Sequence, residues 1–327
     1  LTIRNWFSID SLKTENDGKP DKLVFRSQGC GEATTELRPA IVEASLAALP
    51  IAKRMRWGSS RIEFVRPVHW LIMLLGNEIV DAEILGVRAS RETRGHRFHY
   101  NQSLIIENAD DYLNKLPTTA YVMVDFNLRQ KTIQQQVEAQ AQQVGGVAVI
   151  DQDLLDEVTG LVEWPVALTG RFEDRFLEVP SEALIYSMKE HQKYFPVVDC
   201  DNKLMPHFIT VANIESKDPS QVIDGNERVI RPRLSDAAFF FETDKKTSLV
   251  QFRERLKPIV FQKQLGSIFD KTERIKALSS YIAAQIGGDR VKAEQASQLC
   301  KSDLVSDMVG AFDKMQGLAG YYYACRV

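Results

Sequence analysis

Three groups of basic residues are the side chains best suited to a chemical task, which is the binding of phosphate. A guanidinium group donates paired hydrogen bonds to phosphate oxygens, and lysine acts on them as a point charge. Such side chains also pair with nearby carboxylates, so we expect no more than about half of them to touch RNA. The first group surrounds Trp57 and consists of Lys53, Arg54, Arg56, Arg61 and Arg66. The second group follows it and consists of Arg88, Arg91, Arg94 and Arg97. The third group consists of Arg228, Arg231 and Arg233, joined by Lys189 and Lys193 if the fold brings these two lysines close.

Metal-binding and nucleophilic patterns are weak by comparison. His96 and His99 have a spacing that suits a metal on a helix, but neighbouring arginines would repel a cation and no carboxylate or cysteine set accompanies them. We therefore expect a packing or positioning role for both. His69 lies in an apolar segment and is expected to be a hydrogen-bonded core residue. No Ser-His-Asp or Cys-His pattern indicates a hydrolase.

Composition limits the class of protein. The chain has 327 residues, 44% of them hydrophobic and 26% charged, which is typical of a folded protein with two or three domains. Its 41 basic and 44 acidic residues give a net charge of −3, so any RNA contact must come from local clusters. The longest apolar run, 68–75, is far shorter than the roughly 20 residues of a membrane helix. The four cysteines lack CxxC spacing, which favours reduced thiols in the cytosol: Cys30, Cys200, Cys300 and Cys325.

Apolar periodicity and helix-stop signals predict the elements that must position these residues. Helices are expected at 34–49, 127–144, 151–162 (capped by Asp151 or Asp153), 181–192, 235–243, 247–256, 267–286 and 290–315.

Strands are expected in the first three quarters of the chain. Residues 68–75 and 78–87 predict a hairpin around Gly76-Asn77, 166–172 a single strand, and 194–199 with 207–212 a hairpin around Asp201-Asn202. No convincing strand follows Pro232. The prediction is an α+β chain, with a mixed domain at residues 1–245 and an all-helical one at 246–327.

Several long segments together resemble one known family. They are LPIAKRMRWGSSRIEFVRPVHWLIMLLG (49–76), RGHRF (94–98), VEWPVALTGRFEDRFLEVP (162–180), a stretch over 180–244 that contains KEHQKYFPV, FITVANIE and GNERVIRPRLSDAAFFF, and VFQKQLGSIFDKTERI (260–275). In content and order they resemble the beta subunit of the bacterial two-subunit glycyl-tRNA synthetase. The family's subunit is longer at both ends, and this sequence begins at Leu1, so we expect a central fragment.

The resemblance implies a role and a set of partners. The family attaches glycine to tRNA(Gly) with ATP, and the adenylate chemistry, with its ATP and Mg²⁺, belongs to a separate alpha subunit. The assembly implied is two alpha and two beta subunits in the cytoplasm, without a membrane. This chain would act as scaffold and tRNA-positioning surface and bind no cofactor of its own. Its mixed region would be similar to the editing module of the phenylalanyl enzyme's beta subunit, and its helical region to an HD-type domain.

Signatures of aminoacyl-adenylate formation are missing. Neither class I signature is present, and there is no Walker A sequence. Arg253-Glu254 places the glutamate one position too early for a class II motif, and Thr35 stands where the pattern begun by Gly29 and Gly31 needs arginine. We therefore expect this chain alone not to activate glycine.

A hydrolase is the alternative reading, either trans-editing or HD-type phosphohydrolase. No histidine follows His207, and Lys301 and Asp303 lie where an HD pair is expected, so metal chemistry is not favoured. Editing is needed chiefly where a smaller analogue enters a larger pocket, and glycine has no smaller analogue.

Overall fold

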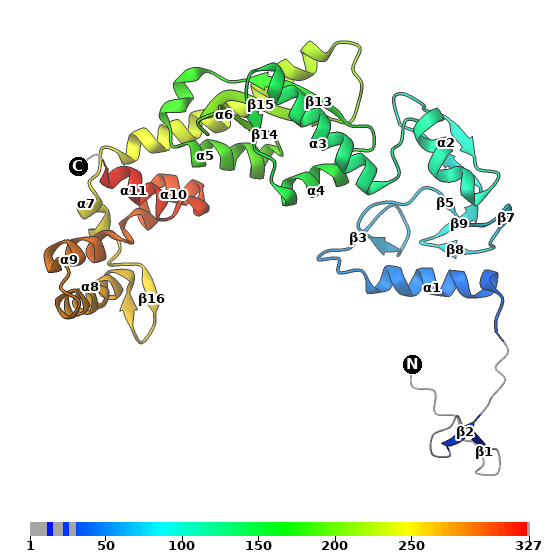
Figure 1. The fold of residues 1–327 in the computed structure, drawn as a ribbon, viewed down its shortest axis with the longest axis horizontal. Coiled ribbons are helices and arrows are strands. Elements are labelled where there is room, and N and C mark those ends of the chain that lie inside the picture. Colours follow the sequence, from blue (N-terminus) through cyan, green and yellow to red (C-terminus); the bar gives the residue numbers. More distant parts are fainter. Residues whose placement is uncertain (1–11, 16–21, 26–30, 326–327) are drawn as a thin grey trace. The chain divides into compact units, whose positions relative to one another are not determined.

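The computed structural model describes residues 12–15, 22–25 and 31–325. It divides into two compact units, residues 1–93 with 103–112 and residues 94–102 with 113–327, which we call the first and second units. Both contain helices and strands (Figure 1), so the chain is of mixed α and β structure, as the sequence predicts. Among the described helices none is both long and apolar enough to cross a membrane. Cys30 and Gly29 lie outside the described residues.

The described part of the first unit contains helix α1, a 3-10 turn at Ala109–Asp111 and several short strands. Helix α1 (Thr34–Ala48) confirms the helix expected at 34–49, and its Val42 and Leu46 pack on a small core that contains Val80 and Ile84. The strands are β1 (Leu12–Glu15), β2 (Lys22–Phe25), β3 (Met55–Arg56), β4 (Glu63–Phe64), β5 (Leu71–Ile72), β6 (Leu74–Leu75), β7 (Glu78–Ile79), β8 (Glu83–Ile84), β9 (Val87–Ser90), β10 (Glu92–Arg94) and β11 (Ser103–Ile105).

Two expectations for this unit need correction. The hairpin turn at Gly76-Asn77 is confirmed between β6 and β7, but each strand has only two residues, and β5 pairs instead in parallel with β9. His69 is exposed and lies outside any strand, so the prediction of a buried core histidine is wrong. Its neighbour Trp70 is exposed as well, whereas Met73 is buried in the small core of the unit.

The second unit is built on a four-stranded antiparallel sheet between two layers of helices (Figure 1). The strand order is β12-β14-β15-β13. The predicted strand and hairpin are confirmed by β13 and by β14 with β15. Its elements are α2 (Tyr112–Thr119), α3 (Phe126–Gln143), β12 (Val147–Ala148), α4 (Gln152–Leu161), β13 (Val166–Arg171), α5 (Ser181–Tyr186), β14 (Phe195–Val198), β15 (Leu204–Ala212) and α6 (Pro219–Asp244).

Side-chain alternation along β15 separates two cores. Ile209 packs with Ile133 and Val137 of α3, whereas its neighbour Phe208 packs with Leu234 of α6, because successive side chains of a strand point to opposite faces. Phe208 is paired in register with Gly170 of β13. A Cβ at Gly170 would lie 2.4 Å from the Phe208 ring, so only glycine fits there.

Helices α3 and α4 begin as predicted, with Asp125 and Asp151 as their N-caps. The helix expected at 181–192 is divided: α5 is followed by a π-helical turn, Ser187–His191. Helix α6 begins far before the expected residue 235 and contains Pro232 in its interior. Its buried Ile230, Leu234, Ala237 and Phe241 keep helical spacing across that proline, so packing outweighs the one hydrogen bond that proline removes.

The remaining elements are α7 (Leu249–Glu254), β16 (Val260–Gln262), β17 (Gly266–Ser267), α8 (Ile268–Gln285), α9 (Arg290–Leu299), α10 (Asp307–Ala311) and α11 (Leu318–Ala324). Helices α7 and α8 confirm two predictions. The prediction of no strand after Pro232 is wrong, because β16 and β17 form a small hairpin. The single helix expected at 290–315 is also wrong, since Ser302–Val305 is a 3-10 turn and Ser306 starts a new helix.

The domain boundary near residue 245 stays a prediction. Helix α6 ends at Asp244, but one hydrophobic core contains Phe241 before that point and Phe252, Met308 and Tyr323 after it.

Candidate nucleic-acid interface

The first basic group contains both structural and unpaired cations. Arg54 donates to the carbonyl oxygens of Leu46 and Ala47, at 3.4 and 3.2 Å, and so satisfies the C-terminal end of α1. Arg56 pairs with Glu63 across the β3–β4 hairpin at 2.6 Å. The remaining members are exposed, and their side chains make no hydrogen bond or ion pair with the described residues: Lys53, Arg61 and Arg66.

The second group divides in the same way. Arg88 pairs with Asp81 at 3.2 Å, and Arg91 pairs with Glu107 at 2.6 Å while donating to the carbonyl of Asn77. Arg94 and Arg97 are exposed and their side chains have no partner in the described part of the chain. These two arginines belong to the second unit, whereas Arg91 belongs to the first.

The third group is largely neutralised. Arg228 pairs with Asp224, and Arg231 with Glu173 at 2.7 Å. Only Arg233 is exposed without a partner among the described residues.

The two lysines assigned to this group face helix α4. The chain does bring residue 194 to α6, because Tyr194 donates to Asn226 at 2.6 Å. Lys189, however, binds Asp151 at 2.8 Å and Lys193 binds Glu157 at 3.0 Å. The Lys189 hydrogen bond, with a further one from the Leu154 N–H, holds the pKa of Asp151 below its usual value.

The RGHRF segment forms a turn at which three of the motifs found in the sequence meet. His96 is buried, and its Nε2 lies 2.6 Å from the carbonyl oxygen of Asn213, in the FITVANIE segment. The Asn213 side chain in turn accepts from the N–H groups of Glu163 and Trp164, in the VEWP segment, at 2.8 and 2.9 Å. The contacts join positions 49 to 117 residues apart in the chain.

Hydrogen bonding assigns the tautomer of His96. Its Nδ1 accepts from the N–H groups of Phe98 and His99, both at 3.2 Å, so the ring hydrogen is on Nε2 and is donated to Asn213. His99 accepts from the Glu215 N–H through Nε2 at 3.0 Å. The predicted packing or positioning role of both histidines is confirmed.

Sequence reasoning missed the aromatic residues around this turn. The His99 ring lies 5.1 Å from that of Tyr121, which lies 5.1 Å from that of Trp164. Phe98 is 73% exposed, beside the unpaired Arg97. The alternation of arginine and aromatic residues in RGHRFHY is a signal that could have pointed to Phe98; nothing local in the sequence points to Tyr121.

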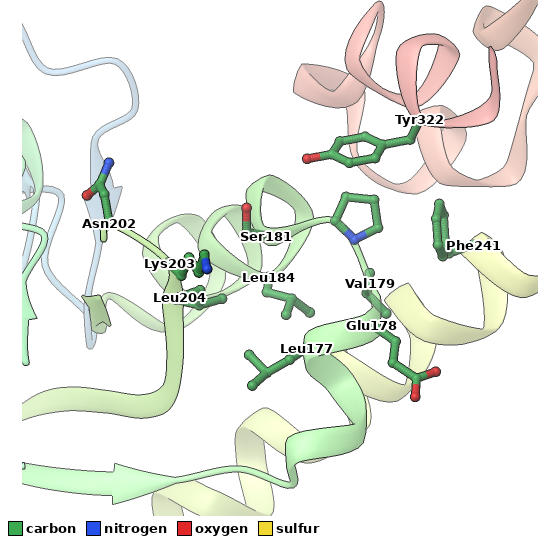
Figure 2. Close-up of a pocket in the computed structure, with 11 residues that line it drawn as sticks. Leu177, Glu178, Val179, Ser181, Leu184, Asn202, Lys203, Leu204, Phe241 and Tyr322 are labelled. Atoms are coloured by element: carbon green, nitrogen blue, oxygen red, sulfur yellow. The ribbon is translucent and has the colours of Figure 1, made fainter. Parts of the chain in front are cut away.

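A pocket of about 520 Å³ lies between α5, α6, the β14–β15 turn and α11 (Figure 2). The polar residues of its lining are Glu178, Ser181, Asn202, Lys203 and Tyr322. Tyr322 donates to Glu182 at 2.8 Å, and burial, followed by that hydrogen bond, raises its pKa to about 12. The lining includes no histidine, and the Ser181 hydroxyl donates to the carboxylate of Glu182 at 3.3 Å.

The aspartates considered for HD chemistry are engaged in the fold. Asp303 accepts from the N–H groups of Gly317 and Gly320, and Asp270 caps α8 through Ser267. Asp307, at the start of α10, is exposed. Within residues 12–15, 22–25 and 31–325, no three His, Cys, Asp or Glu side chains form a group that could hold a metal ion.

Comparison with known proteins gives a consistent result. A family model described as glycyl-tRNA synthetase beta subunit matches residues 4–327. Proteins named glycine–tRNA ligase beta subunit are 59% identical over 315 residues in Hahella chejuensis, 58% over 316 in Marinobacter nauticus and 56% over 317 in Chromohalobacter salexigens. The matches cover 96–97% of this chain but only 46% of each relative, so the chain spans about half their length.

Proposed function

The chain belongs to the glycyl-tRNA synthetase beta subunit family, and from this we propose that it holds and positions tRNA(Gly) for glycylation. A separate alpha subunit performs the ATP- and Mg²⁺-dependent activation of glycine. The family match is the observation that carries this proposal, and the missing adenylate signatures support the division of labour. This chain binds no cofactor of its own in the reaction.

The tRNA-positioning role is supported by the unpaired cations. Both units present exposed basic side chains without a carboxylate partner among the described residues, although the net charge of the chain is −3. Cations already paired in the fold would have to give up those partners to bind phosphate. The candidate contacts are therefore narrowed from the three sequence groups to Lys53, Arg61, Arg66, Arg94, Arg97 and Arg233.

The finer architecture and assembly are part of the same proposal. The mixed region corresponds to an editing-module-like domain and the region after residue 245 to the start of a degenerate HD-like domain. The working assembly contains two alpha and two beta subunits in the cytoplasm. A trans-editing or HD-type hydrolase is not favoured, because the lining of the pocket in Figure 2 includes no histidine or cysteine and the described residues hold no group of three His, Cys, Asp or Glu side chains suited to a metal ion.

Separate purification of the subunits tests the division of labour. The beta subunit that carries this chain, without alpha, should show no glycine-dependent exchange between pyrophosphate and ATP, and adding alpha should give glycylation of tRNA(Gly). Exchange by the beta subunit alone would contradict the proposal.

Two matched double variants test the tRNA role. In the assembled enzyme, Arg61→Gln with Arg66→Gln should weaken tRNA binding and flatten its dependence on salt by roughly 0.7–0.9 per lost phosphate contact. Pyrophosphate exchange should be unchanged. The control, Arg56→Gln with Arg88→Gln, removes equal charge from exposed arginines of the same unit that already pair with carboxylates. Equal loss in both variants would mean that net charge, not these two side chains, determines binding.

A further inference from the structure

We propose that the turn at residues 96–100 is a platform for an unpaired nucleotide of RNA, whose base stacks on Phe98 while adjoining phosphates bind Arg94 and Arg97. The inference rests on the proposed role in holding tRNA and specifies one place where the RNA is held.

The backbone of the turn is fixed from inside the fold. The His96 N–H donates to the carbonyl of Ala120 at 2.8 Å, and the His96 carbonyl accepts from Tyr100 at 2.8 Å. Together with the His96 ring, which binds two N–H groups of the turn and the carbonyl of Asn213, these contacts leave little freedom. A Cβ at Gly95 would lie 2.6 Å from Tyr100 and 2.8 Å from the Ala120 oxygen, so glycine is required for this close approach.

The outer side of the same turn is exposed and unpartnered. Phe98 is 73% exposed, with its ring 6.1 Å from that of His96, although an aromatic ring in water makes no contribution to the core. Arg97 precedes it directly and Arg94 lies at the start of the segment, and neither side chain meets a described carboxylate. A rigid turn with an exposed ring and two guanidinium groups loses little conformational entropy when it binds a ligand.

These side chains fit single-stranded RNA better than a protein. Every base has a face that can stack on an aromatic ring, and such stacking is insensitive to sequence. In a duplex those faces are covered by neighbouring base pairs, so the ring selects an unpaired nucleotide. A protein partner of the usual kind would require a wider apolar patch, whereas the exposed ring of Phe98 lies directly beside the charged Arg97.

Substitutions at Phe98 distinguish stacking from apolar contact. The probe is a fluorescein-labelled RNA single strand of about 8 nucleotides, a usual length for such sites, with the same strand annealed to its complement for comparison. In the assembled enzyme, Phe98→Ala and Phe98→Leu should each weaken single-strand binding about tenfold. Phe98→Tyr should retain binding because the ring remains. Duplex binding should change little in all three.

The dependence of RNA affinity on salt concentration tests the roles of Arg94 and Arg97. Arg94→Gln and Arg97→Gln should each reduce the slope of log affinity against log salt by about 0.7. Arg228→Gln, which removes an arginine already paired with Asp224, should leave the slope unchanged. Unaltered melting temperatures exclude a folding defect.

The outcomes separate this inference from the proposed function. Retained binding in Phe98→Leu, or RNA binding unaffected by every Phe98 change while glycylation of tRNA proceeds, would overturn the stacking platform and leave the family role intact. Loss of alpha-subunit association in the Phe98 variants would show a protein contact instead and would also overturn it. Failure of the unaltered assembly to glycylate tRNA would count against the proposed function itself.

Discussion

Individual side chains show why the sequence alone cannot separate paired from unpaired cations. Arg231 pairs with Glu173, which is 58 positions away, and Lys189 pairs with Asp151, which is 38 positions away. A local reading of the sequence finds the cations but not these partners, because only the fold brings them together. Arg54 is a further case: its carbonyl acceptors lie at a helix end that the sequence predicts, but nothing local shows that the side chain turns back to them.

For a single side chain, we predict that ionisation of Tyr194 lowers the free energy of unfolding at alkaline pH. Burial raises its pKa to about 12, above the ordinary value of 10.0 that applies when the chain is unfolded. The unfolded chain therefore loses the Tyr194 proton at a lower pH than the folded chain does. The contribution of Tyr194 to the free energy of unfolding is complete below pH 10 and is lost as the pH rises to about 12.

Urea unfolding of Tyr194→Phe checks this prediction. At pH 8 the variant should be less stable by about 1 kcal/mol, because Asn226 loses its donor. The difference between wild type and variant should shrink at pH 11. A difference that stays constant from pH 8 to pH 11 would show that folding does not raise the pKa of Tyr194.

Elements with local signals were predicted well, and those without were missed. Helices α1, α3, α4 and α8 have apolar periodicity or capping residues inside their own sequences. Strand β16 is exposed at every position, so it shows no alternation of buried and exposed residues. The predicted start of helix α6, residue 235, is too late because proline is a helix breaker in isolation. In the structure, packing of Ile230 and Leu234 on either side of Pro232 holds the helix together.

The capping of α4 gives a prediction at the scale of the element. Asp151 accepts from the Leu154 N–H at 3.2 Å and from Lys189 at 2.8 Å. Asp151→Ala should lower the free energy of unfolding by about 1–2 kcal/mol, measured by urea denaturation at pH 7. Asp153→Ala is the matched control, since it removes an acid from the same turn that does not cap the helix; a comparable loss there would refute the capping assignment.

At the scale of the whole molecule, the domain boundary near residue 245 stays a prediction. The boundary near residue 245 follows the change from mixed to helical character, whereas the compact units separate residues 1–93 and 103–112 from the rest. The structure adds a buried link across the predicted boundary: Asp244 accepts from the N–H groups of Asp307 and Met308, both at 2.9 Å, and from the Tyr323 hydroxyl at 2.7 Å. Such a link could not be predicted from periodicity, which is a local property.

We therefore predict that α6 and the C-terminal helices unfold together. Asp244→Ala leaves three donors without their acceptor, two of them buried, and should lower the free energy of unfolding by about 3 kcal/mol. Tyr323→Phe removes one bond and should lower it by about 1 kcal/mol. Hydrogen exchange should show protection lost in α6 and α10 alike for Asp244→Ala. Protection lost in α10 alone would indicate separate domains and favour the boundary at residue 245.

The Asp244–Tyr323 bond also sets an order of events during synthesis on the ribosome. The two residues are 79 positions apart, and translation at about 5–20 residues per second separates their appearance by roughly 4–16 seconds. The core between α3, α4 and the sheet, which uses residues from Ile133 to Ile209, is complete before α6 is made. Helix α6 can then pack Leu234 on Phe208 of the finished sheet, whereas the carboxylate of Asp244 gains its Met308 and Tyr323 donors only when the C-terminal helices follow.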